Sequence, residues 1–182
     1  MTPAAATTPS ARPPASTFHA HPADPIPHTV PPANQQDAPH IHALLEFWVA
    51  SGALLRRDIA DIQNAINAFA VTQSNDQQLA ACAALVVYSS RLAEIRSVAT
   101  NPANQRKGAA RAVVNYLTEW AANLEIERVF LLTKAPEFFE RCNFISVNPA
   151  DLPDSFLIDH VHAQARTAKQ KHVMIRDFAA EY

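Results

Sequence analysis

The fold is decided by residues 92–124, which read LAEIRSVAT-NPANQRKG-AARAVVNYLTEWAANL. The first nine of these residues alternate and include β-branched side chains, a pattern typical of a strand. After the Asn-Pro pair at 101–102, apolar residues recur at helical spacing from Lys107 to Leu124 and form one stripe. Gly108 stands between the two patterns. The stretch therefore predicts a strand, a glycine-containing turn and a long amphipathic helix in immediate succession.

Further strands are expected upstream of this stretch. Segments 68–72 and 79–88 are rich in alternating or β-branched residues, and polar turns separate them from each other and from 92–100. Together, the three segments predict an antiparallel meander. Residues 27–31 are expected to form a short strand at a sheet edge, the place where a strand tolerates proline.

Helices and short strands account for the rest of the pattern. Apolar periodicity predicts one helix between Asp37 and Gly52 and a second, short helix after Asp58. Downstream, the expected elements are a strand at 129–132, a helix at 136–141, an extended run at 144–147 and a final strand at 172–176. This order predicts an α+β fold, in which a mixed, mostly antiparallel central sheet carries helices on both faces.

Composition divides the chain into a tail and one domain. Ten of the fourteen prolines lie in the first 39 residues, interleaved with Ala, Thr and Ser. Such a stretch cannot sustain the hydrogen bonds of helices or sheets, so residues 1–26 are expected to be a disordered Pro/Ala-rich tail. Residues 27–182 are expected to form one domain, which suits a length of 182 residues.

Charge and cysteine content argue against several classes of protein. A formal net charge of −2 gives no reason to expect nucleic acid or a membrane surface as a partner. Cys82 and Cys142 belong to no Cys-x-x-Cys or Cys/His group, which argues against a disulfide framework and a structural zinc site. Pairs of histidines two residues apart do not share one helical face, so no metal is expected. These features favour a reducing, cytoplasmic location.

The chemistry is expected at the junction that contains Gly108. Within QRKGAA (105–110), a glycine lets the backbone approach a ligand closely, and the first-turn N–H groups of the helix have no carbonyl partners of their own. This arrangement is typical of an anion site, most often for phosphate. The alternative is that Gly108 only eases the corner between strand and helix. Neither a Walker loop nor a dinucleotide fingerprint is present in the sequence.

Gln105-x-x-Gly108-x-Ala110 resembles the acyl-CoA-binding motif of the GCN5-related N-acetyltransferases (GNAT), Gln/Arg-x-x-Gly-x-Gly/Ala. Longer stretches are similar to the acetyltransferase domain of N-acetylglutamate synthases, the amino-acid N-acetyltransferases that open bacterial arginine biosynthesis. These stretches are GALLRR (52–57), AEIRSVA (93–99), RVFLLT (128–133), PEFFERCNF (136–144) and DLP (151–153). The resemblance covers residues 27–178 and implies a GNAT-like fold. Many relatives carry an amino-acid-kinase-like domain where this chain has the tail, so a short, stand-alone form is expected.

The resemblance implies that the chain transfers an acetyl group from acetyl-CoA to the α-amino group of a free amino acid, with L-glutamate as the expected acceptor. The transfer would proceed by direct attack in a ternary complex, without a metal. It further implies that acetyl-CoA lies along the third meander strand and the start of the helix. The residues implied in cofactor binding are Val98, Ala99, Thr100, Gln105, Arg106, Lys107, Gly108, Ala109, Ala110, Arg111, Thr133 and Phe138.

Glu94 is the candidate for receiving the proton of the attacking amine, directly or through a water molecule. The alternative is a glutamate that only pairs with a neighbouring arginine. Backbone N–H groups near Ser97 and Val98 are the expected donors to the developing oxyanion. Many relatives place a tyrosine on the helix after the next strand to protonate the departing thiolate, whereas this chain has Phe138 and Phe139 there.

For the acceptor, Arg57 matches the arginine of the family's Gly-x-Leu-x-x-Arg segment, and its planar guanidinium suits a carboxylate. Leu55 and Ser97 fall at adjacent substrate-contact positions. Lys169 and Lys171 fall near the final strand, about where bacterial relatives place polar or cationic substrate contacts. Glutamate, glutamine or another small amino acid all remain open as acceptors on this pattern.

Two other functions stay open at this point. An acetyltransferase for a protein or peptide amine would have an open, acidic groove instead of a small pocket with Arg57. A non-catalytic, CoA-binding regulatory partner of an arginine-pathway kinase would use the proline-rich tail for docking. A homo-oligomer is also compatible with the sequence. Cys82 is expected to be a small core residue, or else to line the acyl pocket.

Overall fold

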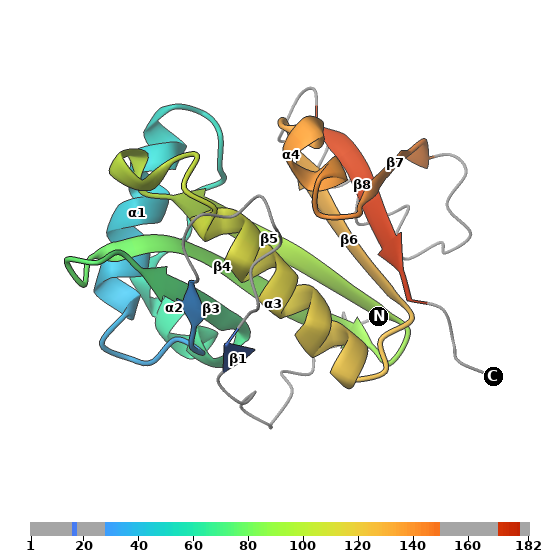
Figure 1. The fold of residues 1–182 in the computed structure, drawn as a ribbon, viewed down its shortest axis with the longest axis horizontal. Helices are drawn as coiled ribbons and strands as arrows, with labels where there is room; N and C mark the ends of the chain where they lie inside the picture. The colour runs from blue at the N-terminus through green and yellow to red at the C-terminus, as the bar shows by residue number, and fades with distance from the viewer. Residues whose placement is uncertain (1–15, 18–27, 150–170, 179–182) are drawn as a thin grey trace.

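The computed structural model describes residues 16–17, 28–149 and 171–178 of the chain (Figure 1). Its centre is a six-stranded sheet with the strand order β3-β4-β5-β6-β8-β7. The strands are β3 (Phe69–Gln73), β4 (Leu79–Ser89), β5 (Leu92–Thr100), β6 (Arg128–Thr133), β8 (His172–Asp177) and β7 (Ile145–Val147). Neighbouring strands are antiparallel except β5 and β6, which are parallel.

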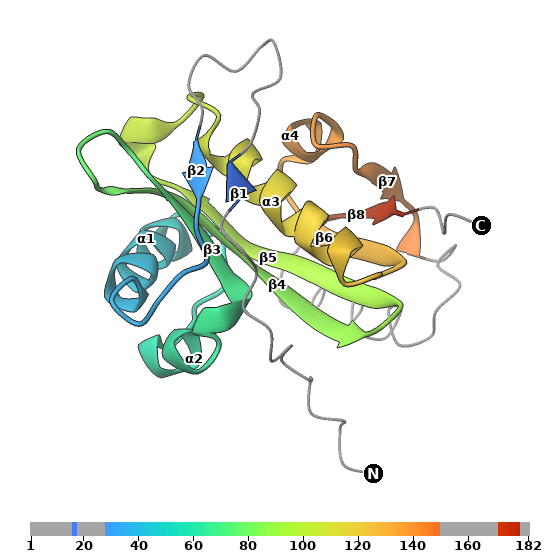
Figure 2. The same cartoon turned by 60° about the horizontal axis from the view of Figure 1, so that its bottom comes forward.

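Helices cover both faces of this sheet. They are α1 (Ala38–Ala50), α2 (Ile59–Asn64), α3 (Ala109–Asn123) and α4 (Pro136–Glu140). Figure 2 shows α1 and α2 against one face and α3 against the other. The predicted α+β fold, with a mixed and mostly antiparallel sheet between helices, is confirmed, and the predicted meander is β3, β4 and β5.

Two apolar clusters fix these helices on the sheet. On one face, Val113 and Leu117 of α3 are fully buried with Leu85 and other strand residues. On the opposite face, Ile41 of α1 and Ile62 of α2 are fully buried in a second cluster. The helical periodicity read from the sequence thus corresponds to the buried sides of the helices.

The predicted edge strand near residue 30 is present and short. Strand β2 (Thr29–Val30) pairs with β1 (Ser16–Thr17) in a separate two-stranded sheet. The chain then runs beside β3, because Pro32 and Ala70 form an isolated bridge. Strand β1 lies within the segment predicted as a tail, and the other residues of 1–26 lie outside the described part of the chain.

Strands β5 and β6 are paired at one end only. Leu92, Ala93 and Glu94 pair with residues 128–130, and the two strands then diverge (Figure 1). A β-bulge accompanies the divergence, since Ser97 and Val98 of β5 stand opposite a single residue of β4. Beyond Glu94, β5 continues to Thr100 and leads to the turn before α3, where the sequence predicts the chemistry. In the described residues, no helix is long and apolar enough to cross a membrane.

Candidate active site

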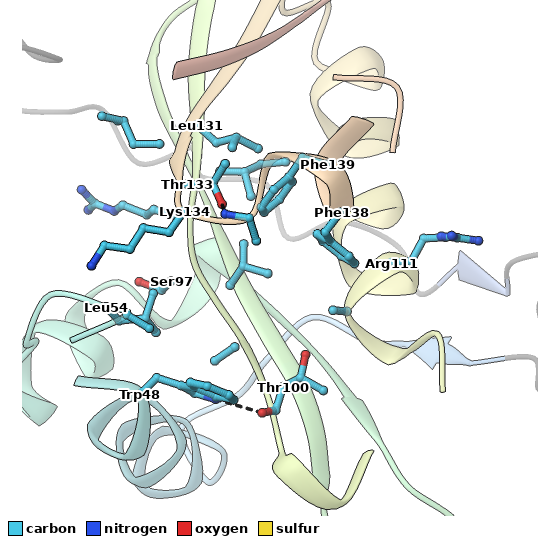
Figure 3. Close-up of a pocket in the computed structure, with 18 of the residues that line it drawn as sticks. Trp48, Leu54, Ser97, Thr100, Arg111, Leu131, Thr133, Lys134, Phe138 and Phe139 are labelled. Carbon is cyan, nitrogen blue, oxygen red and sulfur yellow. Dashed lines mark hydrogen bonds between the residues drawn. The ribbon is translucent and has the colours of Figure 1, made fainter. Parts of the chain in front are cut away.

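A cavity of about 990 Å³ occupies the gap between β5 and β6. Its wall is built by the open half of β5, the turn and first residues of α3, the end of β6, α4 and the loop between α1 and α2. Figure 3 shows side chains on both sides of it: Trp48, Leu54 and Ser97 on one, and Phe138 and Phe139 on the other.

The cavity brings together most of the residues predicted from the sequence. The predicted residues in its wall are Leu55, Arg57, Glu94, Ser97, Val98, Ala99, Thr100, Gln105, Arg106, Gly108, Ala109, Ala110, Arg111, Thr133, Phe138 and Lys171. Lys107 is exposed and does not line the cavity, and Lys169 lies outside the described residues.

The turn before α3 has an unusual backbone. Gly108 is the N-cap residue of the helix and has a left-handed conformation with φ of 85°, and Arg106 is also left-handed with φ of 61°. Glycine has no Cβ and adopts the left-handed conformation without steric cost, which explains why a glycine occupies position 108. The first-turn N–H groups of α3 therefore begin at the cavity wall, where an anion can accept from them.

A histidine that the sequence reading did not single out contacts this turn. The His28 imidazole Nε2 lies 2.7 Å from the backbone carbonyl of Lys107, the residue before the left-handed glycine. With Nε2 protonated, the imidazole donates to this carbonyl. The contact joins the chain just before β2 to the start of α3. No local pattern predicts a partner 79 residues away.

Below the bulge of β5, Cys82 belongs to the core. It is fully buried among the residues that hold α1, and its thiol lies 3.8 Å from the carbonyl oxygen of Ser97. Burial raises the pKa of Cys82 to about 12, so the thiol stays protonated. Cys82 is not among the residues of the cavity wall. Of the two predictions for this residue, the structure favours the core.

Glu94 is the last residue of β5 paired with β6, and its side chain is 3% exposed. Its Oε2 accepts a hydrogen bond from the Tyr88 hydroxyl at 2.6 Å and lies 3.9 Å from Nη1 of Arg96. Glu94 is also among the residues of the cavity wall, so the proton-accepting role and the pairing with an arginine both stay predictions.

The loop between α1 and α2 brings Arg57 to the bulge. Its Nη1 donates a hydrogen bond to the Ser97 hydroxyl at 3.3 Å. Burial, followed by the charge of nearby Arg96, lowers the pKa of Arg57 from its usual value. Just before β8, burial and the charge of Lys134 lower the pKa of Lys171. Both cations line the cavity.

Cations dominate the described wall of the cavity, which contains one acidic side chain, that of Glu94. The cationic residues are Arg56, Arg57, Arg96, Arg106, Arg111, Lys134, Arg141 and Lys171. Several of these are additions to the predicted set. Arg96 could have been found, because it is two residues from Glu94 on a strand and shares its face.

Lys134 and Trp48 make hydrogen bonds that the sequence did not indicate. Lys134 Nζ donates to the Gly52 carbonyl at 2.9 Å and so joins the end of β6 to the loop after α1. The Trp48 indole donates to the Thr100 carbonyl at 2.9 Å (Figure 3). Trp48 lies on α1, and the periodicity of that helix predicts no partner for its indole N–H. Both contacts depend on how distant segments pack.

Metal chemistry has no visible support in the part of the chain that the structure describes. Within residues 16–17, 28–149 and 171–178, no three His, Cys, Asp or Glu side chains lie close enough together to hold an ion.

Comparisons with known proteins agree with this geometry. The profile of the Acetyltransferase (GNAT) family matches residues 34–144. An amino-acid acetyltransferase of Mycobacterium tuberculosis is 35% identical over 117 residues, which are 63% of this chain and 67% of that protein.

Two solved structures are similar over most of the chain. The Mycobacterium tuberculosis protein Rv2747, in complex with CoA and NLQ, has a TM-score of 0.73 and 27% identity, and the match covers 82% of this chain and 99% of that one. The N-acetylglutamate synthase of Neisseria gonorrhoeae, complexed with coenzyme A and N-acetyl-glutamate, has a TM-score of 0.73 and 24% identity. That match covers 84% of this chain but 35% of the longer enzyme, and it shows the fold alone.

Proposed function

The chain belongs to the GNAT family of acetyltransferases, and on this basis we propose that it acetylates the α-amino group of L-glutamate, the first step of arginine biosynthesis. The coarser activity rests on the family and on the amino-acid acetyltransferases among its relatives: the chain is an acetyl-CoA-dependent N-acetyltransferase that acts on amino acids. The observation that carries the finer proposal is the cation-lined cavity at the bulge of β5.

The fit of acetyl-CoA to the cavity supports its proposed position. The cofactor's pyrophosphate would accept hydrogen bonds from backbone N–H groups at the start of α3, next to Gly108. Arg106 and Arg111 line the same end and would add attraction for the phosphates. The pantetheine arm would extend along Val98–Thr100, into the gap that β6 leaves open.

In the proposed reaction, the uncharged amine attacks the thioester carbonyl carbon and a tetrahedral oxyanion forms. Backbone N–H groups at Ser97 and Val98, which the bulge removes from regular pairing, would donate to this oxyanion. The amine's proton passes to Glu94, directly or through water, and the C–S bond breaks to release the CoA thiolate.

Helix α4 offers no phenol to protonate that thiolate. Its cavity-facing residues are Phe138 and Phe139, whose rings meet edge to face with centroids 4.8 Å apart. A thiolate with an ordinary thiol pKa of about 8.5 is a tolerable leaving group, so it would depart without a strong protein acid. The two rings would then serve to pack against the cofactor and the core.

The acceptor end suits a small amino acid with carboxylate groups. Arg57 would bind one carboxylate through its guanidinium fork, with Leu55 and the Ser97 hydroxyl beside it. Lys171 would face the same space. Lys169 stays a prediction. An acidic groove, expected for a protein amine, is unlike this wall, in which Glu94 is the one acidic side chain among the described residues.

Thiol release tests the proposal. The purified chain is mixed with acetyl-CoA and, in separate reactions, with glutamate, glutamine, aspartate and a lysine-containing peptide, and each product is identified by mass spectrometry. We expect the highest kcat/KM for L-glutamate, with N-acetylglutamate as product. A higher value for another amino acid would overturn the acceptor but retain the chemistry. Release of no thiol with any acceptor would favour the non-catalytic alternative.

A further inference from the structure

We propose that Tyr88 is a positioning residue for the reaction, which holds the Glu94 carboxylate in place and keeps it ionised. The inference rests on the role proposed for Glu94 as proton acceptor. The observation behind the inference is the short contact between the Tyr88 hydroxyl and Oε2 of Glu94. The two oxygens are 2.6 Å apart, which is within hydrogen-bonding range.

The backbone turns Tyr88 toward Glu94. Val87 pairs with Ala93 and Ser89 pairs with Leu92, so Tyr88 is the extra residue of a second β-bulge in the β4–β5 pair. A bulge changes the direction of a side chain locally, and bulges are frequent beside active sites. The two bulges of this strand pair, at Tyr88 and at Ser97, lie on either side of Glu94 in the ladder.

The tyrosine ring also contacts strand β6. It stacks on Phe130 of β6, with centroids 6.1 Å apart and an interplanar angle of 26°. Phe130 is fully buried and is the residue with which Glu94 pairs. The ring of Tyr88 therefore reaches from β4 across β5 to β6, and its hydroxyl meets the carboxyl group on the middle strand.

The hydrogen bond has a defined electrostatic effect. A phenol that donates to a carboxylate stabilises the ionised form more than the protonated form, because only the ionised oxygen carries the charge. Burial, and then the neighbouring carboxylate, raise the pKa of the Tyr88 hydroxyl, so the phenol stays a donor at neutral pH. Among the described residues, the charged groups that act on Glu94 include Arg96 on β5, Arg57 in the α1–α2 loop and Lys171 before β8.

These cations also favour the ionised carboxylate, but they line the cavity as well, so they would also interact with a ligand bound there. Arg96 lies 3.9 Å away, beyond hydrogen-bonding distance, and Arg57 contacts Ser97. A bound amino acid would draw these cations toward its own carboxylates. Tyr88 is absent from the cavity wall, so its hydrogen bond to Glu94 can persist while the acceptor is bound.

Tyr88→Phe isolates the hydroxyl, since the phenylalanine ring can keep the stacking on Phe130. The pKa of Glu94 is followed by carboxyl-carbon NMR in protein labelled at glutamate, with Glu94→Gln assigning the resonance. Kinetics are measured in parallel from pH 5 to 9 on the same preparations. Tyr116→Phe is the matched control, because it removes another buried phenol hydroxyl, from α3.

We expect Tyr88→Phe to raise the pKa of Glu94 by roughly one unit, since a hydrogen bond to a charged group is worth about that much. The carboxylate must be ionised to accept a proton, so the acid limb of kcat/KM should move to higher pH by the same amount. The value of kcat at neutral pH should fall about threefold to tenfold, with little change in the KM for acetyl-CoA. Tyr116→Phe should shift neither the pKa nor the acid limb.

An unchanged Glu94 pKa in Tyr88→Phe would overturn the inference, whatever the activity. A raised pKa with an unmoved acid limb would retain the contact but overturn its part in the reaction. If Glu94→Gln kept full kcat, the proposed role of Glu94 would fail, and the positioning role of Tyr88 with it. The NMR titration needs no acceptor, so failure to find the substrate is distinguishable from failure of the Tyr88–Glu94 contact.

Discussion

Strands β5 and β6 differ sharply between their two ends. At the closed end, Leu92–Glu94 pairs with residues 128–130, and Leu92 and Phe130 are buried. At the open end, residues 95–100 of β5 and 131–133 of β6 line a cavity of about 990 Å³. The same two strands thus join the halves of the sheet at one end and provide binding space at the other.

The difference separates the residues that stabilise the fold from those that serve the reaction. Glu94 stands at the boundary, because it is the last residue of β5 paired with β6 and also part of the cavity wall. Its backbone is paired at the closed end, and the next residues of β5 line the cavity. Substitutions on the two sides of Glu94 should therefore affect different properties.

The largest expected effect is on stability, at the closed end. Leu92→Ala removes a side chain that is 4% exposed and should lower the free energy of unfolding by about 2–5 kcal/mol, measured by urea denaturation. Val98→Ala, at the half-buried open end, should lower it by about 1 kcal/mol. Folded Leu92→Ala protein should keep its kcat/KM within threefold. Equal losses of stability at the two positions would remove the distinction between the two ends.

The next effect is on cofactor binding. Gly108→Val places a β-branched side chain at φ of 85° and should raise the KM for acetyl-CoA by about 100-fold, through a displaced turn and lost contacts to the pyrophosphate. Gly52→Val is the control for backbone strain, since Gly52 is left-handed at φ of 71° and has nothing within 4 Å of an added Cβ. A similar rise in both variants would mean that strain, and not the phosphate site, explains the result.

Acceptor binding should respond to Arg57. Arg57→Ala should raise the KM for L-glutamate by roughly 10- to 100-fold, because charge-assisted hydrogen bonds contribute about 1.5–3 kcal/mol, while the KM for acetyl-CoA changes little. Arg91→Ala removes the same charge from a side chain that is 76% exposed, paired with Glu127 and outside the cavity wall, and it should change either KM by less than threefold. Equal responses of the two variants would argue for a general effect of charge instead of a carboxylate site.

The smallest effect is expected at His28. His28→Ala removes the contact to the Lys107 carbonyl and should raise the KM for acetyl-CoA by about twofold to tenfold without lowering kcat, as for one ordinary hydrogen bond. His40→Ala, on the exposed side of α1, should leave both constants unchanged. A loss of kcat alone in His28→Ala would contradict a role in shaping the phosphate turn.

Local patterns predicted the elements well but not the irregularities. Helix α3 follows from its period of 3.6, which marks the side that the structure buries. In the meander, alternate residues of β4 enter two different clusters, so both faces of this strand are buried. The two bulges at Tyr88 and Ser97 left no such sign, since an extra residue in a strand depends on its partner.

The candidate site was predictable where one motif holds it and less so where distant segments meet. Gly108 and its neighbours predict the turn before α3 from local sequence alone. Arg57 was added through the resemblance to a known family. The contacts of Lys134 with Gly52 and of Tyr88 with Glu94 depend on packing and register, and one sequence does not encode these locally. Asp37 shows the same limit, because it precedes α1 as predicted but accepts from the Asn34 N–H instead of capping the helix.

A crystal structure of the chain with bound CoA would test most directly whether the open end is the cofactor site. We predict that the pyrophosphate accepts hydrogen bonds from backbone N–H groups between Gly108 and Arg111, and that the pantetheine arm lies between β5 and β6. A pyrophosphate bound elsewhere, or a gap that stays empty at saturating CoA, would contradict the assignment of the open end to acetyl-CoA.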